Sequence, residues 1–380
     1  MKCYPSIIKQ HRKFYIKYKA KNYFYRMDRN NTLDTILYGD RGYPILSQWI
    51  KDQDFSKIFL LVDSNTLEHC AARFQAKLSG ISIEEVIEMP AGEIHKHLGT
   101  CQSIWETISD YGGDRKSLII NLGGGVVTDL GGFVAATFKR GISFVNIPTS
   151  LLAMVDASVG GKTGVDFQGL KNQIGVIVPP AWVLIDPEFL NTLPSEEYRS
   201  GYAEMLKHGL IADAFYWKKL SDYAQINTED MQPLIQHSVG IKASVVEKDP
   251  NENGLRKILN YGHTLGHAIE SYFLESEADK TLLHGEAIAI GMITEAFLSH
   301  KLCGLSAETM EQIKLVFKQI YPRVDILPEA QSKIVDLLKF DKKNSHGRIK
   351  FALLEAIGKP MLDVEVPEEL LQQAFDFYRA

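Results

Sequence analysis

The stretch SLIINLGGGVVTD, residues 117–129, decides the fold class of this chain. Ser117 to Leu122 form a short apolar run of the kind that makes a buried strand. Gly123-Gly124-Gly125 interrupts the run, and Val126 to Asp129 then open a helical pattern. A strand that passes through a glycine turn into a helix is typical of α/β proteins. The stretch therefore predicts a parallel sheet.

Three other short runs extend this pattern on either side. Lys57 to Val62, Ile142 to Ile147 and Trp182 to Ile185 are apolar, and helical patterns separate them. The first two runs end in Asp63-Ser64-Asn65 and Pro148-Thr149-Ser150. Ligands of open parallel sheets gather at the carboxyl ends of the strands. We therefore expect a ligand site to be built from these loops.

After Pro194 the sequence changes to long helical periodicity. The helical segments run from about Glu196 through Ala203 to Leu220, from Leu234 to Glu247, from His284 to Leu302 and from Glu308 to Ile320. We expect an α/β N-terminal dinucleotide-binding domain with a parallel sheet, followed by an all-α C-terminal metal-binding domain. The expected divisions are a basic extension at 1–26, the α/β domain at 27–190 and the helical domain at 191–380, with the hinge in the proline-interrupted stretch 179–194.

Composition excludes several classes of protein. The formal charge of −5 over 380 residues argues against a nucleic-acid-binding or anionic-membrane-binding surface. Four cysteines without a CxxC pair favour a reducing, cytoplasmic location, and no apolar run approaches the about 20 residues that span a bilayer. The first 26 residues hold eight Lys or Arg and no acidic residue. We expect this extension to be disordered or non-native, with Met27 as the true start.

The glycine turn is the first candidate site. A backbone without Cβ atoms at the start of a helix lets a pyrophosphate approach the helix N-terminus. The run is not a complete GxGxxG fingerprint because Thr128 stands at the last glycine position, so an ordinary tight turn is an open alternative. Asp63 and Asn65 could bond ribose hydroxyls or merely cap a turn. Glu93 and Lys96 could likewise contribute to the same site or be solvated surface charges.

Histidines in the helical half are candidates for a metal site. His263 and His267 are four residues apart, which places both imidazoles on one face of a helix. Imidazole is a common ligand of zinc-like metals, and His284 and Glu204 could complete the set. The alternative is that these histidines cap helices or bond internally.

Several cations on this net acidic protein could converge on an anion. Lys162 directly follows Val159-Gly160-Gly161, and Lys171 directly precedes Asn172. Further cations lie at Lys207, Lys242, Arg256 and Lys342. A guanidinium suits a carboxylate, and ammonium groups suit phosphate oxygens. Each lysine taken alone would be interpreted as a solvated surface charge.

Together these segments resemble the 3-dehydroquinate synthase family of the sugar-phosphate cyclase superfamily. The strongest elements are MVDASVGGKT at 154–163, LKN at 170–172, AEMLK at 203–207 and NYGHTLGH at 260–267. The glycine stretch 123–129 and His284-Gly285-Glu286 add to them. The resemblance covers the chain from about residue 33 to its end.

The resemblance implies a homodimer that converts 3-deoxy-D-arabino-heptulosonate 7-phosphate into 3-dehydroquinate and phosphate in the shikimate pathway. It implies a bound NAD and a divalent metal, zinc or cobalt. NAD⁺ would oxidise a ring hydroxyl, phosphate would leave by elimination, the hydride would return, and an aldol step would close the ring. The implied substrate is a small anionic sugar phosphate, with no nucleic-acid or membrane partner.

The resemblance also assigns residues to roles. The zinc ligands are Glu204, His263 and His284. The NAD contacts are Asp63, Asn65, Glu93, Lys96, Gly124, Gly125, Asp129, Thr149, Ser150, Leu152, Lys162, Lys171, Thr192, Leu193 and Glu197. The substrate-site residues are Asp156, Lys162, Asn172, Lys207, Lys242, Arg256, Asn260, His267 and Lys342, with Arg140 supplied across the dimer. His267 would transfer hydroxyl protons, and the sequence does not select between Lys342 and the adjacent Lys343.

Three alternatives share many of these features. Another sugar-phosphate cyclase would use the same chemistry on a different substrate, and Arg256 with Asn260 and His267 favours an acid substrate against it. A metal-dependent polyol dehydrogenase would release reduced cofactor in stoichiometric amount. A catalytically silent NAD-binding protein would be expected to have lost ligands or lysines, and all of them are present in this sequence.

Overall fold

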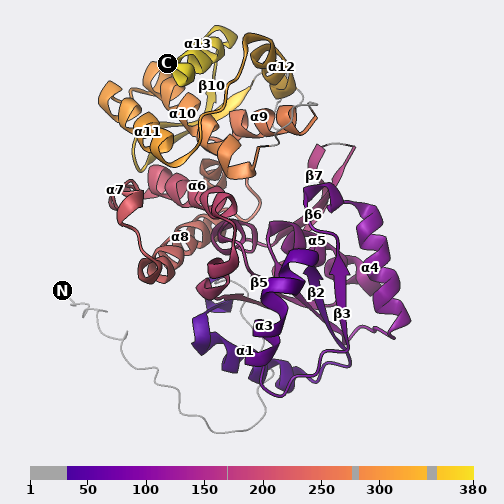
Figure 1. Ribbon diagram of the computed structural model, residues 1–380. Helices are drawn as coiled ribbons and strands as arrows, with labels where there is room; N and C mark the ends of the chain where they lie inside the picture. Colours follow the sequence, from indigo (N-terminus) through magenta and orange to yellow (C-terminus); the bar gives the residue numbers. More distant parts are fainter. Residues whose placement is uncertain (1–31, 169, 276–281, 340–348) are drawn as a thin grey trace, which may run out of the picture. The chain divides into compact units, whose positions relative to one another are not determined.

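The structure is a computed structural model that describes residues 32–168, 170–275, 282–339 and 349–380 (Figure 1). The described residues form one compact unit. The basic extension 1–26, Lys342 and Lys343 lie outside the described residues. None of the helices formed by the described residues combines the length and the apolar character that a membrane span needs.

A six-stranded parallel sheet forms the first half of this unit, in the order β1-β8-β5-β4-β2-β3. Its strands are β1 (Ile36–Tyr38), β2 (Ile58–Asp63), β3 (Glu85–Met89), β4 (Leu118–Gly123), β5 (Ser143–Pro148) and β8 (Trp182–Ile185). The four strands expected from the sequence are confirmed. Central β4 is buried along its whole length, as its uniformly apolar sequence predicts.

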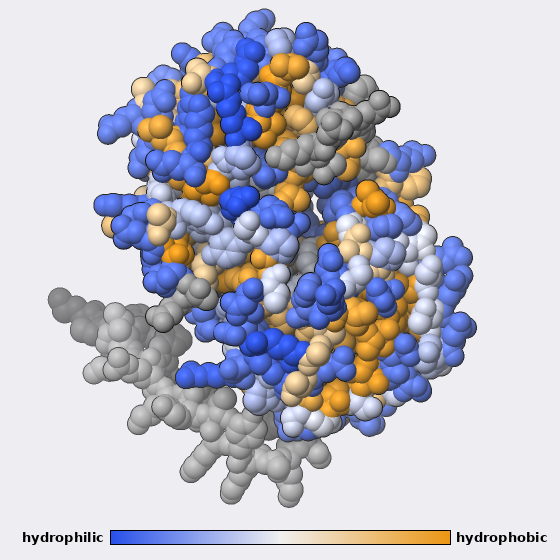
Figure 2. All heavy atoms as spheres, in the orientation of Figure 1, coloured by the Kyte–Doolittle hydropathy of each residue, from blue (hydrophilic) through white to orange (hydrophobic). Residues whose placement is uncertain are grey.

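Helices cover both faces of the sheet, and the alternation of side chains decides which face each strand residue serves. Leu60 and Ile120 pack with α1 (Gly39–Gln53) and α3 (Ala72–Lys77), whereas Leu61 and Ile119 pack with the helices of the opposite face. Those helices are α4 (Leu98–Asp110) and α5 (Gly125–Thr137). Strand β3 forms one edge of the sheet, where Figure 2 shows apolar side chains at the surface.

The C-terminal half is helical, as expected. Its helices are α6 (Ser195–Ala212), α7 (Ala214–Leu220), α8 (Thr228–Lys248), α9 (His263–Glu275), α10 (His284–Cys303), α11 (Ala307–Ile320), α12 (Pro328–Lys339) and α13 (Glu368–Arg379). The segment from Glu196 to Leu220 is two helices because Asp213 caps a new one, accepting hydrogen bonds from Phe215 N and Tyr216 N.

Two hairpins were not anticipated. Strands β6 (Lys162–Phe167) and β7 (Leu170–Ile177) form one beside the sheet, and β9 (Lys350–Ala356) and β10 (Lys359–Glu365) form the other within the helical half. The first carries two of the lysines expected at the site. One apolar core joins the inner face of the sheet to the helical half, so the division expected at 190/191 is not a gap in the core and stays a prediction.

Close helix packing through glycine brings the histidine segments together. Gly262 has φ +79° and precedes α9. A Cβ placed on Gly291 of α10 would lie 2.0 Å from the carbonyl oxygen of Gly262. The Glu295 carboxylate of α10 accepts hydrogen bonds from Gly262 N at 2.6 Å and Leu265 N at 3.3 Å. At the start of α10, Gly285 N donates to Ser200 Oγ of α6 at 2.9 Å. Close approaches at glycine and hydrogen bonds to backbone N–H groups therefore hold together the three helices that carry the candidate ligands.

We expect Gly291→Ala to destabilise the protein by about 3 kcal/mol, because the new methyl group would force α9 and α10 apart. The matched control is Gly240→Ala in α8, where no atom lies within 4 Å of the new Cβ. This control should stabilise the protein by about 0.5–1 kcal/mol through helix propensity. Chemical denaturation measures both changes, and equal effects of the two substitutions would contradict the packing argument.

Candidate active site

Three candidate metal ligands lie at the junction of α6, α9 and α10. Glu204 is in the middle of α6, while His263 and His284 are the first residues of α9 and α10. Glu204 Oε1 lies 3.4 Å from His263 Nε2 and 3.6 Å from His284 Nε2. The structure thus brings together three residues that are up to 80 positions apart in the sequence, from 204 to 284.

The Glu204 carboxylate fits a divalent cation. Its side chain is fully buried, and neither oxygen has a hydrogen-bond partner of normal geometry among the described residues. Burial raises the pKa of Glu204, but the Lys207 ammonium and His284 outweigh it and hold this pKa below its usual range. An ionised, buried carboxylate is costly unless a cation satisfies it. The Lys207 ammonium lies beside Oε2, whereas the two imidazoles lie beside Oε1, and one carboxylate with two imidazoles is a donor set for zinc or cobalt.

His267 lies in the same cluster. Its ring centroid is 5.1 Å from that of His263 and 5.8 Å from that of His284. Ligand atoms of the three imidazoles lie within 4.8 Å of one another, so three histidines form a second geometrically possible ligand set. The sequence expectation that His267 is not a ligand therefore stays a prediction.

A group of buried charges borders the cluster of candidate metal ligands. Lys207 forms an ion pair with Glu204, and Lys242 Nζ of α8 lies 2.6 Å from Asp156 Oδ1. Burial raises the pKa of Asp156, but the nearby Lys242 and Lys207 ammonium groups outweigh burial and lower this pKa below its usual value. The carboxyl therefore stays ionised. Burial lowers the pKa of Lys242, and Asp156 opposes that shift. The structure thus gathers two ammonium groups and one carboxylate, as expected.

Arg256 and Asn260 lie on the 3-10 helix η8 (Leu255–Asn260). Arg256 is 3% exposed, and its Nη1 donates to Pro250 O at 2.8 Å. A Cβ on Gly160 would lie 3.0 Å from Arg256 Nη2, so glycine makes room for the guanidinium. Asn260 Nδ2 donates to Glu252 Oε1 at 2.9 Å.

Lys162 joins this group through the same acidic residue. Its ammonium forms an ion pair with Glu252, which links the β6–β7 hairpin to the loop before η8. Glu252 was not singled out from the sequence. No motif marked it, because its role depends on the folding of the hairpin against that loop.

The glycine turn joins the carboxyl ends of β4 and β5. Thr149 N donates to Gly123 O at 3.0 Å, and a Cβ on Gly124 would meet Ser150 Oγ at 3.4 Å. Thr128, which breaks the glycine fingerprint, donates its hydroxyl to Gly124 O at 3.2 Å. The turn is therefore a cradle at the N-terminus of α5 that a side chain would narrow, as phosphate binding requires.

Asp63 shows that a capping role and a binding role are compatible. Asp63 Oδ1 accepts from Thr66 N at 2.8 Å, and Thr66 Oγ1 accepts from Asp63 N at 2.9 Å, which forms a capping box. Asn65 lies within the short helix α2 (Ser64–Thr66) that this box starts. The capping alternative is confirmed for Asp63, and a carboxylate has capacity to accept further bonds.

Lys96 lies at the centre of a group of residues expected at the cofactor. Its buried ammonium lies 2.8 Å from Asp129 Oδ2, 2.8 Å from Asn172 Oδ1 and 3.9 Å from Glu93 Oε1. Burial lowers the pKa of Lys96, but Asp129 and Glu93 outweigh it and raise this pKa. Asn172 adopts φ +51°, a left-handed conformation that asparagine tolerates, and its N–H donates to Asp166 Oδ1 at 2.7 Å.

Ion pairs connect the group around Lys96 with the cluster of candidate metal ligands. Lys171 Nζ lies 3.4 Å from Glu93 Oε1 and 2.7 Å from Glu270 Oε1. The other oxygen of Glu270 lies 3.3 Å from His284 Nδ1. Glu270 was not singled out from the sequence, although its spacing from His263 and His267 places it on their face of α9.

The remaining expected cofactor residues lie where the sheet meets α6. Leu152 precedes the π-helix η5 (Ala153–Ala157), and a Cβ on Gly201 of α6 would lie 2.3 Å from Leu152 N. Thr192 Oγ1 donates to Phe189 O at 3.3 Å, and Leu193 packs against the core. Burial raises the pKa of Glu197, which is in the first turn of α6.

Arg140 lies apart from these residues. It is exposed and follows the C-terminus of α5, whereas the glycine turn is at the N-terminus of that helix. A helix of 13 residues spans about 20 Å. Within one chain, Arg140 is thus separated from the glycine turn.

His208 is a further buried polar residue that the sequence analysis missed. Its Nδ1 lies 2.6 Å from Ser238 Oγ, and its Nε2 has no partner among the described residues. Burial, with a contribution from Lys207, lowers the pKa of His208 to about 3, so the ring is neutral. Ligand atoms of His208, Asp156 and Glu204 lie within 4.8 Å of one another.

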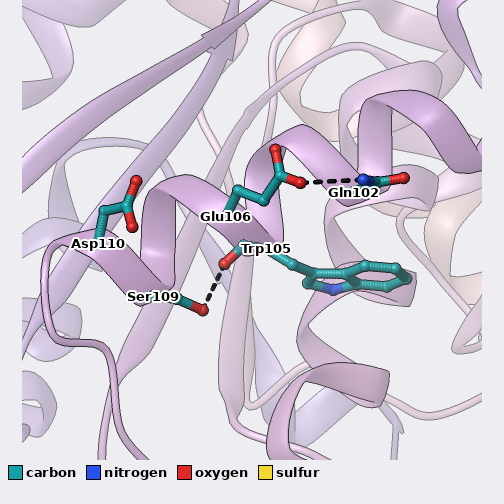
Figure 3. A pocket seen from close by; sticks show the side chains of 5 residues that line it. All are labelled: Gln102, Trp105, Glu106, Ser109 and Asp110. Atoms are coloured by element: carbon teal, nitrogen blue, oxygen red, sulfur yellow. Dashed lines mark hydrogen bonds between the residues drawn. The ribbon is translucent and has the colours of Figure 1, made fainter.

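A depression on the outer face of α4 is unrelated to these residues (Figure 3). It is lined by Gln102, Trp105, Glu106, Ser109 and Asp110. Gln102 Nε2 donates to Glu106 Oε1 at 2.9 Å, and Ser109 Oγ donates to Trp105 O at 2.7 Å. These bonds stay within the helix, and the lining offers neither a cation nor an imidazole.

The fold and the cluster define a class of protein: an α/β dinucleotide-binding fold joined to a helical half that carries a divalent-metal site. Residues 86–200 match the family model for the 3-dehydroquinate synthase N-terminal region, and residues 201–344 match that for the C-terminal region. The 3-dehydroquinate synthase of Parabacteroides distasonis is 42% identical, covering 88% of this chain and 94% of the relative. That of Gloeobacter violaceus is 41% identical, covering 84% and 89%. The chain belongs to the 3-dehydroquinate synthase family.

Solved structures agree with this assignment. A crystal structure of 2-deoxy-scyllo-inosose synthase complexed with carbaglucose-6-phosphate, NAD⁺ and Co²⁺ is 25% identical with a TM-score of 0.76, covering 91% of this chain and 96% of that one. ValA (2-epi-5-epi-valiolone synthase) from Streptomyces hygroscopicus, with NAD⁺ and Zn²⁺ bound, has a TM-score of 0.79 at 24% identity, covering 96% and 99%. The second likeness shows the shared fold.

We expect Glu204→Gln and His263→Ala to lose bound metal and His267→Ala to keep it, because Glu204 is the buried carboxylate that lacks hydrogen bonds. His237→Ala is the control, since its side chain is 47% exposed on another helix. Equilibrium dialysis against Zn²⁺ followed by elemental analysis gives the stoichiometry. Loss of metal from His267→Ala, with retention by Glu204→Gln, would instead establish the three-histidine set.

Proposed function

We propose that this protein converts 3-deoxy-D-arabino-heptulosonate 7-phosphate into 3-dehydroquinate and phosphate. The observation that carries the proposal is the junction of the Glu204, His263 and His284 cluster with the buried cations Lys207 and Lys242, in a chain of this family. An oxygen-rich anionic sugar suits such a site, because hydroxyls suit a divalent cation and phosphate suits ammonium groups. The complex of 2-deoxy-scyllo-inosose synthase with a sugar phosphate analogue supports this substrate class.

Glu204, His263 and His284 would hold the divalent cation, zinc or cobalt. Gly124 and Gly125, with Asp63 and Asp129, would hold NAD. When bound, NAD⁺ supplies reversible hydride acceptance and the cation polarises hydroxyl oxygens. The lyase reaction depends on both groups under this proposal.

The chain's own cations would bind and orient the substrate. Arg256 would engage the carboxylate through its planar guanidinium, and Gly160 leaves space beside it. Lys162 and Lys242 would bind phosphate, with Glu252 and Asp156 holding their ammonium groups in place. Lys342 and Asn172 would complete the set, as the family resemblance implies.

His267 would move protons at the substrate hydroxyls. It shares one face of α9 with His263, and its ring lies beside those of both histidine ligands. An imidazole is suited to general acid–base work near neutral pH. The substrate's own phosphate would act as the base for elimination.

A different sugar-phosphate cyclase activity is the second candidate, because 2-deoxy-scyllo-inosose synthase shares this fold at 25% identity. The buried guanidinium of Arg256 favours an acid substrate against it. We also propose a cytoplasmic location, which the free thiols of Cys70, Cys101 and Cys303 support.

The metal-loaded protein with catalytic amounts of NAD⁺ is expected to release one phosphate per heptulosonate phosphate and to accumulate no NADH, because the hydride returns to the product. Phosphate detection and absorbance at the NADH band follow the two quantities together. NADH formed in step with substrate consumption would favour a polyol dehydrogenase. A folded, metal-loaded and NAD-bound sample that releases no phosphate would reject the proposal.

We further propose a homodimer in which Arg140 acts in the partner's active site. The separation of Arg140 from the glycine turn along α5 supports this arrangement. Exposed apolar side chains on the β6–β7 hairpin, Phe167 at 45% and Ile177 at 55%, offer surface for association.

Subunit mixing tests this arrangement. Arg140→Ala and Lys242→Met homodimers should each be inactive, and a random mixture should recover about a quarter of the wild-type activity, since half the dimers hold one intact site. If Arg140 acted within its own chain, the mixture would stay inactive. Size-exclusion chromatography of each variant confirms that the dimer persists.

A further inference from the structure

Glu270 lies between the two halves of the proposed site without belonging to either. Its side chain is only 5% exposed and uses both carboxylate oxygens. Oε2 lies 3.3 Å from His284 Nδ1, and Oε1 accepts from Lys171 Nζ at 2.7 Å. Helix α9 therefore presents a buried carboxylate to a proposed metal ligand and to a lysine of β7.

The contact with His284 fixes the orientation of that ring. The Glu270 carboxylate can only accept, so His284 Nδ1 is the donor in this contact. In the neutral ring that a metal requires, Nε2 would then carry the lone pair, and Nε2 is the atom that faces Glu204 at 3.6 Å. Carboxylates that receive the second N–H of a ligand histidine orient the ring and strengthen it as a ligand. Glu270 thus stands behind His284 where such a carboxylate would stand.

The contact with Lys171 leads to the cofactor side. Lys171 also lies 3.4 Å from Glu93, and Glu93 lies 3.9 Å from Lys96. Lys96 in turn pairs with Asp129 of α5, in the helix that the glycine turn starts. The charges alternate in sign at each step from α5 to His284, so moving one ammonium changes the field at the next carboxylate.

We propose that Glu270 is a positioning residue for His284, and that its ion pair with Lys171 couples metal binding to dinucleotide binding. This inference rests on the proposed function, in which NAD is bound, and on the family resemblance, which assigns Glu93, Lys96 and Lys171 to the NAD contacts. A dinucleotide that orders these side chains holds Lys171 on Glu270 and thereby holds the His284 ring in its ligand orientation. Such coupling is reciprocal: NAD⁺ tightens the metal, and the metal tightens NAD⁺ by the same factor.

The test measures the Zn²⁺ dissociation constant of the apoprotein by competition with a chromogenic chelator. Each measurement is made without NAD⁺ and with NAD⁺ at ten times its own dissociation constant for the variant concerned. Wild-type protein should bind Zn²⁺ about tenfold more tightly with NAD⁺. Glu270→Gln should weaken Zn²⁺ binding by about 10–100-fold and abolish the effect of NAD⁺.

Lys171→Met separates the two roles of Glu270. It leaves the carboxylate beside His284 but removes the connection to the cofactor side, so Zn²⁺ affinity should no longer respond to NAD⁺. Lys257→Met is the matched control, because it breaks a lysine–carboxylate pair with Asp363 at 3.0 Å that has no part in this chain of charges. The control should keep the wild-type ratio.

The unfolding midpoint of each apoprotein separates positioning from a structural role. A structural role would lower the midpoint and leave the ratio of Zn²⁺ affinities unchanged. Wild-type protein that binds both ligands without coupling would overturn this inference, as would coupling that persists in both Glu270→Gln and Lys171→Met. Wild-type protein that binds neither Zn²⁺ nor NAD⁺ would instead reject the proposed function.

Discussion

The buried carboxylate of Glu204 is the constraint on which the site depends. An ionised side chain without hydrogen bonds is expensive in a protein interior unless a cation satisfies it. The Lys207 ammonium meets that need at one oxygen, and a divalent cation held together with the two imidazoles would meet it at the other.

Backbone contacts hold this arrangement in place. Gly262 and Gly291 let α9 and α10 approach until a methyl group no longer fits, and Gly285 lets α10 touch Ser200 of α6. The candidate ligands are therefore positioned by packed helices, His263 and His284 at helix starts and Glu204 in the middle of α6, rather than by loops. Such rigidity suits a site whose ligands must keep their orientation while substrate and products exchange.

Sequence reasoning recovered most of the fold and most of the candidate site. The strands around the glycine turn and the helical second half followed from periodicity. The sequence did not predict that Glu252, Glu270 and His208 lie at the site, because none of them belongs to a recognisable motif. Each contacts a partner outside its own local segment, Lys162, His284 and Ser238 respectively, and only the folded chain creates those pairs.

The sequence by itself determined the parallel α/β half, the helical half and the pairing of His263 with His267, because strand and helix periods are local properties of a chain. The tertiary structure alone decided that Glu204 meets His263 and His284, that Lys171 spans Glu93 and Glu270, and that Arg140 stands apart. Those outcomes depend on close approaches between helices and on burial, which no local pattern specifies. Electrostatic pairing over such separations exists only after the core has formed.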